Sequence, residues 1–490
     1  MTISAKSQDY IERIKSAFIG LDTTYPLADG RTTRRIYLDS TASTLMFRPA
    51  HEAVEAYYRH YANTHSLLHF SAKISTELYR WAHERLLRFL HADPKDYACF
   101  FTGSGATAGM NRMARVFRDF RPDRDMVLVS LMEHHSNDLP HRKHAGRVIH
   151  TPLEDHDGQP GCIRMDALEE TLRENGDRIN YVAVTGVSNV TGIINPIYKV
   201  AELAHRYGVL VLVDGAQMVA HLPVFISDPL HPERNLDAFV FSGHKTYVPG
   251  SPGVVVCRKD ILSAMEPEEV GGGMVERVFV DHYLITEKFP DREEAGTPNI
   301  PGAIGLATAV DILDRVGMDA LYEEESDLIS YALGQLKTIS TVMVYGETDM
   351  SVCRRAASIS FNIYGMDHGL TAAILNDYHN IAVRNECFCA HPYVEEMIKD
   401  DIPPELHKQE NILSLRAKLK SGMVRASFGL YNTRKDVDRL VAALKDISHN
   451  RDTYRPLYSV DEDGNYRHNS FHPPLGQIFS IHKLVDSVFE

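Results

Sequence analysis

The chain has 490 residues and is acidic, with 66 Asp and Glu against 52 Lys and Arg and a formal net charge of −14. This length suits two or three domains, and the acidic balance disfavours a nucleic-acid partner. No apolar run is long enough to cross a bilayer, and the polar N-terminus lacks a signal-peptide core, so we expect no membrane association. Six scattered cysteines predict reduced thiols in a cytoplasmic setting.

A glycine-rich loop is the first predicted feature with a chemical signature. Cys99–Thr102 is predicted to be a strand, residues 103–109 (Gly-Ser-Gly-Ala-Thr-Ala-Gly) a loop, and Met110–Phe117 a helix. Glycines let the backbone approach an anion, and a helix N-terminus offers free N–H groups. The spacing fits neither a Walker loop nor the dinucleotide fingerprint. A phosphate cradle and a plain tight turn therefore both stay open at this point.

Further along the chain, four predicted strands each end in polar or ionisable residues. The strands are Met126–Ser130, Tyr181–Val187, Val209–Val213 and Ala238–Phe241, and they lead into Glu133-His134-His135, Ser188-Asn189, Asp214-Gly215-Ala216-Gln217 and Ser242-Gly243-His244-Lys245. From about 36 to 302, such apolar runs alternate with helical stretches, which is typical of a parallel sheet with crossover helices. Ligands bind at the carboxyl edge of such sheets, so we expect a site there.

Asp214 and Lys245 place a carboxylate and an amine on adjacent strand ends of that edge. This pair suits pyridoxal 5′-phosphate (PLP), because an aspartate keeps the pyridine nitrogen protonated and a lysine forms the Schiff base. A structural ion pair at a sheet edge is the alternative interpretation.

Residues 303–450 are predicted to form a smaller α+β domain. It has helical patterns at Pro301–Arg315 and Met318–Leu336, and strand-like runs at Ala357–Ile363, Ile381–Val383 and Val424–Leu430. A charged insertion with helical pieces is expected at 393–422. Residues 1–35 are expected to pack with the small domain, and 451–490 form a C-terminal extension that ends in the amphipathic stretch Ile478–Phe489.

Four motifs in a fixed order carry a resemblance to a known family. They are Glu-His-His-Ser-Asn at 133–137, Asp-Gly-Ala-Gln at 214–217, Ser-Gly-His-Lys at 242–245 and Ala-Gly-Thr-Pro at 295–298. From Tyr37 to about Leu444 the chain resembles fold-type I PLP enzymes of the class V aminotransferase superfamily. It is most similar to the group II cysteine desulfurases, which include selenocysteine lyase-like enzymes. The resemblance implies a large PLP-binding domain, 36–302, with a mainly parallel seven-stranded sheet.

The resemblance also implies roles in a cofactor pocket. By position, Lys245 matches the Schiff-base lysine, Asp214 the partner of the pyridine nitrogen, Gln217 the donor to the ring hydroxyl, His134 the imidazole stacked on the ring, and Asn189 the residue near the ring hydroxyl and substrate carboxylate. Ala106, Thr107, Ser242 and His244 fall at phosphate-binding positions, Ala106 in place of a common threonine. Thr297 matches a phosphate ligand from the other subunit, which implies a homodimer. Five histidines between 134 and 150 lack metal-ligand spacing, so no metal is expected.

The implied reaction depends on the small domain. Arg384, Cys389 and the Ala390 that follows it match the family's cysteine motif, and Arg425 matches the arginine that binds the substrate α-carboxylate. In the implied mechanism L-cysteine loses its α-proton, with Lys245 as proton shuttle. The Cys389 thiolate then takes the sulfur as a persulfide, and alanine is released. A protein sulfur acceptor is an implied partner.

Several departures from the family pattern leave the substrate more open than the cofactor. Glu386 replaces a glycine, and Cys387 stands where histidine is frequent; we favour a bystander over a second sulfur relay for Cys387. Another class V lyase or epimerase, with Cys389 incidental, stays an alternative, as does a simple aminotransferase. A PLP-fold scaffold or sulfur-delivery partner is a third, against which the intact Lys245, Asp214 and Arg425 argue.

Overall fold

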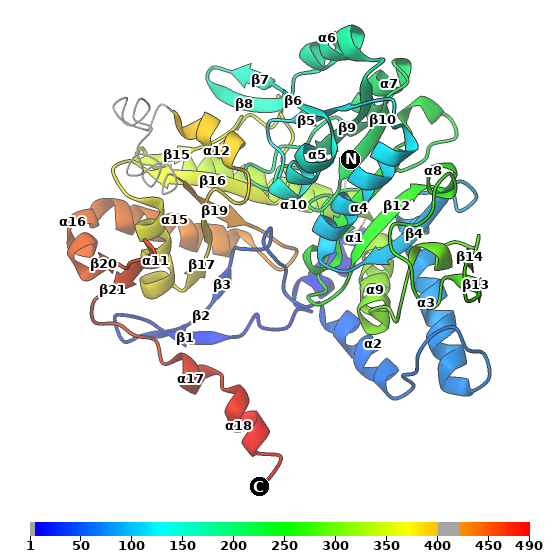
Figure 1. Cartoon of the computed structure of the whole chain (residues 1–490). Helices are drawn as coiled ribbons and strands as arrows, with labels where there is room; N and C mark the ends of the chain where they lie inside the picture. The colour runs from blue at the N-terminus through cyan, green and yellow to red at the C-terminus, as the bar shows by residue number, and fades with distance from the viewer. Residues whose placement is uncertain (1–4, 400–421) are drawn as a thin grey trace.

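The computed structural model describes residues 5–399 and 422–490. A seven-stranded sheet forms its centre, in the order β4-β12-β11-β10-β9-β5-β6 (Figure 1). The strands are β4 Tyr97–Thr102, β5 Met126–Ser130, β6 Arg147–Thr151, β9 Ile179–Thr185, β10 Leu210–Asp214, β11 Ala238–Ser242 and β12 Gly253–Arg258. Only β12 runs antiparallel to both of its neighbours. The predicted mainly parallel sheet is therefore confirmed, with β9 ending at Thr185 rather than Val187.

Helices cover both faces of this sheet. They include α2 Arg48–Tyr58, α3 Phe70–Phe89, α4 Gly105–Phe120, α5 Leu139–His144, α6 Met165–Asn175, α7 Ile197–Arg206, α8 Lys259–Ser263 and α9 Ile300–Val316. The strand β10 shows why: Val211 and Val213 belong to one core cluster and Leu210 and Leu212 to another. A strand buried on both faces is a continuous apolar run, which is how this segment looked in the sequence.

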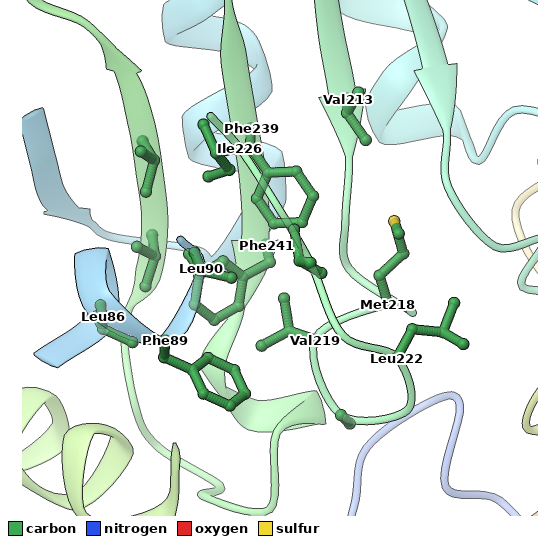
Figure 2. Close-up of a cluster of buried hydrophobic side chains, with 14 of the residues drawn as sticks. Leu86, Phe89, Leu90, Val213, Met218, Val219, Leu222, Ile226, Phe239 and Phe241 are labelled. Atoms are coloured by element: carbon green, nitrogen blue, oxygen red, sulfur yellow. The ribbon is translucent and has the colours of Figure 1, made fainter. Parts of the chain in front are cut away.

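Figure 2 shows the core beneath the carboxyl edge of the sheet, where side chains from α3 meet β10, β11 and the loop after β10. Phe239 and Phe241 are fully buried there. A Cβ at Gly215 would lie 1.9 Å from Cζ of Phe239, so this position next to Asp214 admits no side chain. Truncating a buried phenylalanine to alanine costs about 3–5 kcal/mol, so this packing holds the strand ends firmly in place.

A second, antiparallel sheet has the order β15-β16-β19-β18. Its strands are β15 Val342–Val344, β16 Ser358–Ile363, β18 Arg384–Glu386 and β19 Met423–Ser427, packed on α10 Met318–Leu336, α11 His368–His379 and α15 Arg434–His449. The strand predicted at 357–363 is present as β16, and the one predicted at 424–430 is present as β19, which ends at Ser427 rather than Leu430. The run at 381–383 forms β17, Ile381–Ala382, which pairs with β3, Ile36–Tyr37, outside this sheet.

The chain ends and the expected insertion lie around these two sheets. The helix α1, Ala5–Lys15, brings Ile11 and Ile14 into the core cluster of the large sheet. At the other end, α17 Leu475–Ile478 and α18 Ile481–Asp486 extend away from the body (Figure 1). The expected 393–422 insertion begins inside α12, His391–Ile398, and its residues 400–421 lie outside the described part. The domain boundaries stay a prediction.

Four two-stranded antiparallel hairpins lie outside the two larger sheets. They are β1 Thr24–Pro26 with β2 Thr32–Arg34, β7 Leu153–His156 with β8 Gln159–Ile163, β13 Val275–Val278 with β14 Tyr283–Ile285, and β20 Tyr458–Val460 with β21 Tyr466–His468.

Among residues 5–399 and 422–490, no helix combines the length and the apolarity that a membrane span requires.

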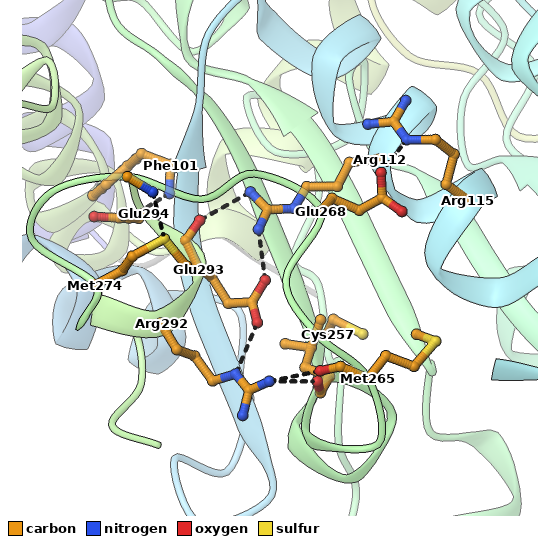
Figure 3. A network of polar contacts seen from close by, with 12 residues as sticks. Phe101, Arg112, Arg115, Cys257, Met265, Glu268, Met274, Arg292, Glu293 and Glu294 are labelled. Carbon is orange, nitrogen blue, oxygen red and sulfur yellow. Dashed lines mark hydrogen bonds and ion pairs between the residues drawn. The ribbon is translucent and has the colours of Figure 1, made fainter. Parts of the chain in front are cut away.

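A buried ionic network anchors the segment that leads to Thr297 (Figure 3). Arg112 of α4 donates to Oε2 of Glu293 at 2.6 Å, and Arg292 donates to Oε1 at 3.2 Å. Next to them, the Phe101 amide of β4 donates to Glu294 at 2.7 Å. A buried carboxylate is stable only when charges and donors surround it, so residues 292–294 are fixed to β4 and α4.

Candidate active site

A cavity of about 690 Å³ opens at the carboxyl edge of the large sheet and is closed on its other side by β18, β19 and the turn after β18. It is lined by all the predicted site residues except Thr297, namely Ala106, Thr107, His134, Asn189, Asp214, Gln217, Ser242, His244, Lys245, Arg384, Cys389 and Arg425. The predicted convergence of the strand ends on one site is confirmed.

Asp214 and Lys245 form the acid–amine pair at the base of the cavity. Asp214 ends β10, and its Oδ1 accepts a hydrogen bond from the Ala216 amide at 2.9 Å. Burial raises the pKa of Asp214, against the opposing effect of its backbone hydrogen bond and of Lys245. Burial lowers the pKa of Lys245 to about 8, and Asp214 opposes this shift. Lys245 therefore offers more neutral, nucleophilic amine near neutral pH than a lysine of ordinary pKa does.

His134 presents a neutral imidazole to the same cavity. It caps a short 3-10 helix (His135–Asn137), where its Nδ1 accepts a hydrogen bond from the Ser136 amide at 3.0 Å. Burial, with a further contribution from Lys245, lowers the pKa of His134 to about 3. Because Nδ1 is an acceptor, the ring proton resides on Nε2.

Glu133 fixes the turn that carries His134, a role that the sequence did not reveal. Its buried carboxylate accepts hydrogen bonds from the Ser130 hydroxyl, the Asn137 amide group at 2.6 Å and the Thr185 backbone at 2.9 Å. Burial raises the pKa of Glu133 to about 8 in spite of these donors. This side chain thus ties β5 to β9 directly behind the cavity.

The glycine-rich loop and Ser242 form the wall at the start of α4. Gly105 has φ of +58°, and a Cβ there would lie 2.8 Å from the Ser242 hydroxyl. The Ala106 amide donates to that hydroxyl at 2.7 Å, and Thr107 bonds Ser136 at 2.7 Å. The N-cap residue Ser104 makes no side-chain hydrogen bond to α4, and residues 103–107 at the start of this helix line the cavity. The arrangement suits an anionic group such as a phosphate.

Opposite this wall, Arg425 is 3% exposed and stacks on Phe388, with its guanidinium carbon 4.7 Å from the ring centroid. It donates to the Asn189 carbonyl at 2.8 Å and pairs with Asp39 at 3.3 Å, while its Nε is buried without a hydrogen-bond partner. Burial lowers the pKa of Arg425 to about 10, so it stays charged at neutral pH. A buried guanidinium with N–H donors still unused suits a carboxylate ligand.

Asp39 and Arg384 lie next to Arg425, and we call these three residues the arginine corner. Arg384 lies directly across from Arg425 in the pairing of β18 and β19, and its Nη1 is 3.8 Å from Asp39. Burial raises the pKa of Asp39, against the opposing effect of both arginines. The sequence assigned Asp39 no role. Its only signal was its place at the start of the region that resembles the family.

Cys389 lies on a tight turn between β18 and α12. Glu386, Phe388 and Cys389 all have positive φ, at 92°, 51° and 56°. The large domain holds this backbone: the His135 amide donates to the Cys389 carbonyl at 2.7 Å, and Asn189 donates to the Phe388 carbonyl at 2.7 Å. Strained non-glycine residues persist only where surrounding contacts enforce them. The turn is short, since Glu386 ends β18 and α12 starts at His391.

The two neighbouring cysteines occupy different environments. Cys389 is exposed and lines the cavity, whereas Cys387 is 4% exposed and packs in a core cluster with Phe388 and Tyr393. Burial raises the pKa of Cys387 to about 11, which leaves it as a poorly reactive thiol. The expectation that only one of them reaches the site agrees with this placement.

Gln217 and Thr297 make different contacts from those that the family roles suggest. Gln217 lines the cavity and donates to the Thr41 carbonyl at 2.9 Å. Thr297 is outside the cavity of its own chain, where its hydroxyl accepts a hydrogen bond from Asn63 at 3.2 Å. A phosphate contact from Thr297 would have to be made to a second chain.

The comparisons with known proteins agree with this architecture. Residues 36–440 match the family model described as "Aminotransferase class-V". A probable cysteine desulfurase of Halalkalibacterium halodurans is 35% identical over 417 residues, 84% of this chain and 92% of that protein.

Two solved structures share the fold, each with a TM-score of 0.70. The apo cysteine desulfurase of Thermococcus onnurineus NA1 is 29% identical and aligns over 85% of this chain and 95% of its own. The cysteine desulfurase CsdA of Escherichia coli, in an S-sulfonic acid form, is 28% identical over 89% and 98%. The resemblance inferred from the motifs is thus confirmed at the level of the family. The chain belongs to the class-V aminotransferase family.

Proposed function

We propose that the protein is a PLP-dependent cysteine desulfurase that converts L-cysteine to L-alanine and forms a persulfide on Cys389. One observation carries the proposal: an exposed thiol, a lysine amine of lowered pKa and a buried arginine line the same cavity. A lyase or aminotransferase needs the amine and the arginine but not the thiol. The relatives named cysteine desulfurase support the same assignment.

The residues present fit PLP. The start of α4 lines the cavity, and the absence of a side chain at Gly105 lets the Ser242 hydroxyl approach it, so this wall suits the phosphate, and Asp214 suits the pyridine nitrogen. Lys245 suits the covalent attachment, and the neutral ring of His134 suits stacking. Bound there, PLP would supply an electron-withdrawing ring for the substrate amino acid.

Binding and proton transfer then fall to the chain's own residues. Arg425 lines the cavity and would bind the substrate carboxylate through N–H groups that Asn189 and Asp39 do not use, with Phe388 keeping water from one face of the guanidinium. The free amine of Lys245 would take the α-proton of the substrate, because a pKa of about 8 lets it both accept and return a proton near neutral pH.

Sulfur transfer would be the work of Cys389. Its thiolate attacks the substrate sulfur, and a new S–S bond forms as the carbon–sulfur bond of the substrate breaks. The electron pair of the broken bond stays with the carbon skeleton, which leaves as alanine after protonation. No external oxidant is required for this step. The later loss of the outer sulfur to a thiol would suit a protein acceptor.

A homodimer with shared active sites is part of the proposal. Thr297 lies outside the cavity of its own chain, and Leu67, Leu68 and Phe70, which follow its hydrogen-bond partner Asn63 in the sequence, are 59%, 93% and 84% exposed. Exposed apolar side chains gathered in one segment are typical of an interface. The cytoplasmic location stays a prediction.

The test is incubation of the purified protein with L-cysteine. We expect alanine and sulfur release in equal amounts in the presence of a thiol reductant, and borohydride should fix PLP on Lys245. Alanine, serine and cysteine sulfinate tested in parallel separate desulfuration from other class V reactions. Cysteine-independent turnover of another amino acid, or a borohydride adduct on a different lysine, would refute the proposal.

A further inference from the structure

A cluster of sulfur, nitrogen and oxygen ligands lies outside the active site, where the hairpin of β7 and β8 meets the segment before β16. Cys162 is on β8 and Cys353 is on the distant segment, yet their Sγ atoms are 3.6 Å apart. The backbone fixes this contact, because the Ile194 amide donates to the Arg354 carbonyl at 3.0 Å. The Cys162 thiol also lies 3.4 Å from the Ile194 carbonyl.

A carboxylate completes the group. A carboxylate oxygen of Glu154, on β7, and the two sulfurs all lie within 4.8 Å of one another. His156, two residues further along the strand, has Nε2 at 3.4 Å from Glu154. Glu154, Cys162 and Cys353 form the only such cluster of three or more potential ligands among the residues that the structure describes.

Gly161 allows the imidazole to approach the same place. A Cβ at this position would lie 2.7 Å from Nε2 of His156 and 3.2 Å from the sulfur of Cys353. Any side chain would therefore separate the two groups. The glycine leaves space in which the imidazole and the thiol can approach each other beside Glu154, although His156 lies outside the group of ligand atoms that are within 4.8 Å of one another.

The separation of the sulfurs distinguishes two chemistries. A disulfide needs about 2.0 Å between the sulfurs. Two thiolates bound to one tetrahedral zinc at about 2.3 Å lie about 3.8 Å apart. The observed 3.6 Å is close to the second value.

We propose that Glu154, His156, Cys162 and Cys353 bind one zinc ion, with the loss of the thiol protons of both cysteines. Two thiolates, an imidazole and a carboxylate are a donor set that zinc prefers, in the number that closes a tetrahedral site. This site is independent of the proposed desulfurase activity.

The zinc would join the β7–β8 hairpin to the core cluster on which the turn that carries Cys389 packs. Glu154, His156 and Cys162 come from the β7–β8 hairpin, whereas Cys353 belongs to the core cluster that contains Cys387 and Phe388. A structural metal contributes directly to folding stability. Its expected effect is therefore on the melting temperature and on the geometry of the turn, and no step of the sulfur chemistry passes through it.

Metal analysis of the purified full-length protein tests this inference. We expect about one zinc per chain after dialysis against a weak chelator, and a melting temperature that falls when a strong chelator removes it. Cobalt added to the metal-free protein should give thiolate-to-cobalt absorption. Cys162→Ser and Cys353→Ser should both lose the zinc, and Cys389→Ser, the matched control on an exposed cysteine, should retain it.

A variant that keeps the fold guards against misfolding as the cause. Glu154 is 40% exposed in its side chain, so Glu154→Gln should stay folded and yet bind zinc more weakly. Zinc that is absent from the wild-type protein, or that persists in both cysteine variants, would overturn the proposal. So would an intact-protein mass lower by two hydrogens that dithiothreitol restores, because the pair would then be a disulfide.

Discussion

The two walls of the cavity are built in opposite ways. On the side of Lys245, the functional groups end buried strands, and packing around Phe239 and Gly215 fixes them. On the side of Cys389, the thiol lies on an exposed turn of strained backbone that two hydrogen bonds from the large domain hold. A group that holds a cofactor benefits from rigidity, whereas a thiol that receives sulfur and passes it on must reach both the cavity and solvent.

This difference separates the effects that substitutions should have. Changes on the strand side should abolish all chemistry that depends on the cofactor. Changes on the turn side should affect sulfur transfer alone. Changes in the arginine corner should alter substrate affinity and leave the cofactor bound.

The largest effect is expected for Lys245→Ala on the strand side. Loss of the positioned amine removes both the cofactor attachment and the proton carrier, so alanine formation should fall by about 10²–10⁴-fold or more. Steady-state assays of alanine measure it, with Lys259→Ala, which is remote from the cavity, as the control. Turnover within tenfold of wild type would show that another amine does this work.

The next largest effect belongs to the arginine corner. Arg425→Ala removes a buried, charged ligand of the substrate carboxylate. The lower kcat/KM for cysteine should correspond to a loss of about 2–5 kcal/mol of transition-state stabilisation. Arg384→Ala is the matched control, because its side chain is 57% exposed and an exposed pair contributes about 1 kcal/mol or less. Equal losses for the two variants would mean that the carboxylate binds between them rather than at Arg425. PLP absorbance should be unchanged in both.

The lowered pKa of Lys245 gives a pH prediction for the strand side. Only the neutral amine attacks PLP, so uptake by the cofactor-free protein should accelerate as pH rises, with its midpoint near pH 8, and then level off. In Asp214→Asn the carboxylate that raises the pKa of Lys245 is gone, and the midpoint should move lower. Stopped-flow absorbance follows the uptake rate. A rate that still climbs past pH 10 would indicate a lysine of ordinary pKa.

The smallest effect is expected for Asp39→Asn. The Asp39 carboxylate pairs with both arginines and competes with the substrate carboxylate, so its neutralisation should lower KM for cysteine by no more than about fivefold, or 1 kcal/mol. Steady-state kinetics measure this change. An increase in KM would mean instead that Asp39 holds Arg425 in position for the substrate. The arginine corner would then be fixed in place before substrate binds, as the groups at the strand ends are.

The strand side could be predicted from the sequence because its signals are local. An apolar run followed by Asp214 or by Ser242-Gly243-His244-Lys245 identifies both the strand and the group at its end. Parallel strands bring these ends to one edge, and the cavity lies there.

The rest depends on contacts between distant segments. The pairing of Asp39 with Arg425 spans 386 positions, and the approach of Cys162 to Cys353 spans 191. The turn at Cys389 has left-handed backbone at residues that are not glycine, so the residue types in this segment did not predict the conformation. Such conformations are enforced by tertiary contacts, here the hydrogen bonds from His135 and Asn189.

The central claim is that the exposed turn carries the sulfur. Its most direct measurement is mass-spectrometric mapping of persulfides after a single turnover with L-cysteine, in the wild-type protein and in Cys389→Ala and Cys387→Ala. The account predicts a persulfide on Cys389 in the wild type and in Cys387→Ala, and none in Cys389→Ala, which should retain PLP and release no sulfur. A persulfide on Cys387, or release of sulfur by Cys389→Ala at the wild-type rate, would contradict it.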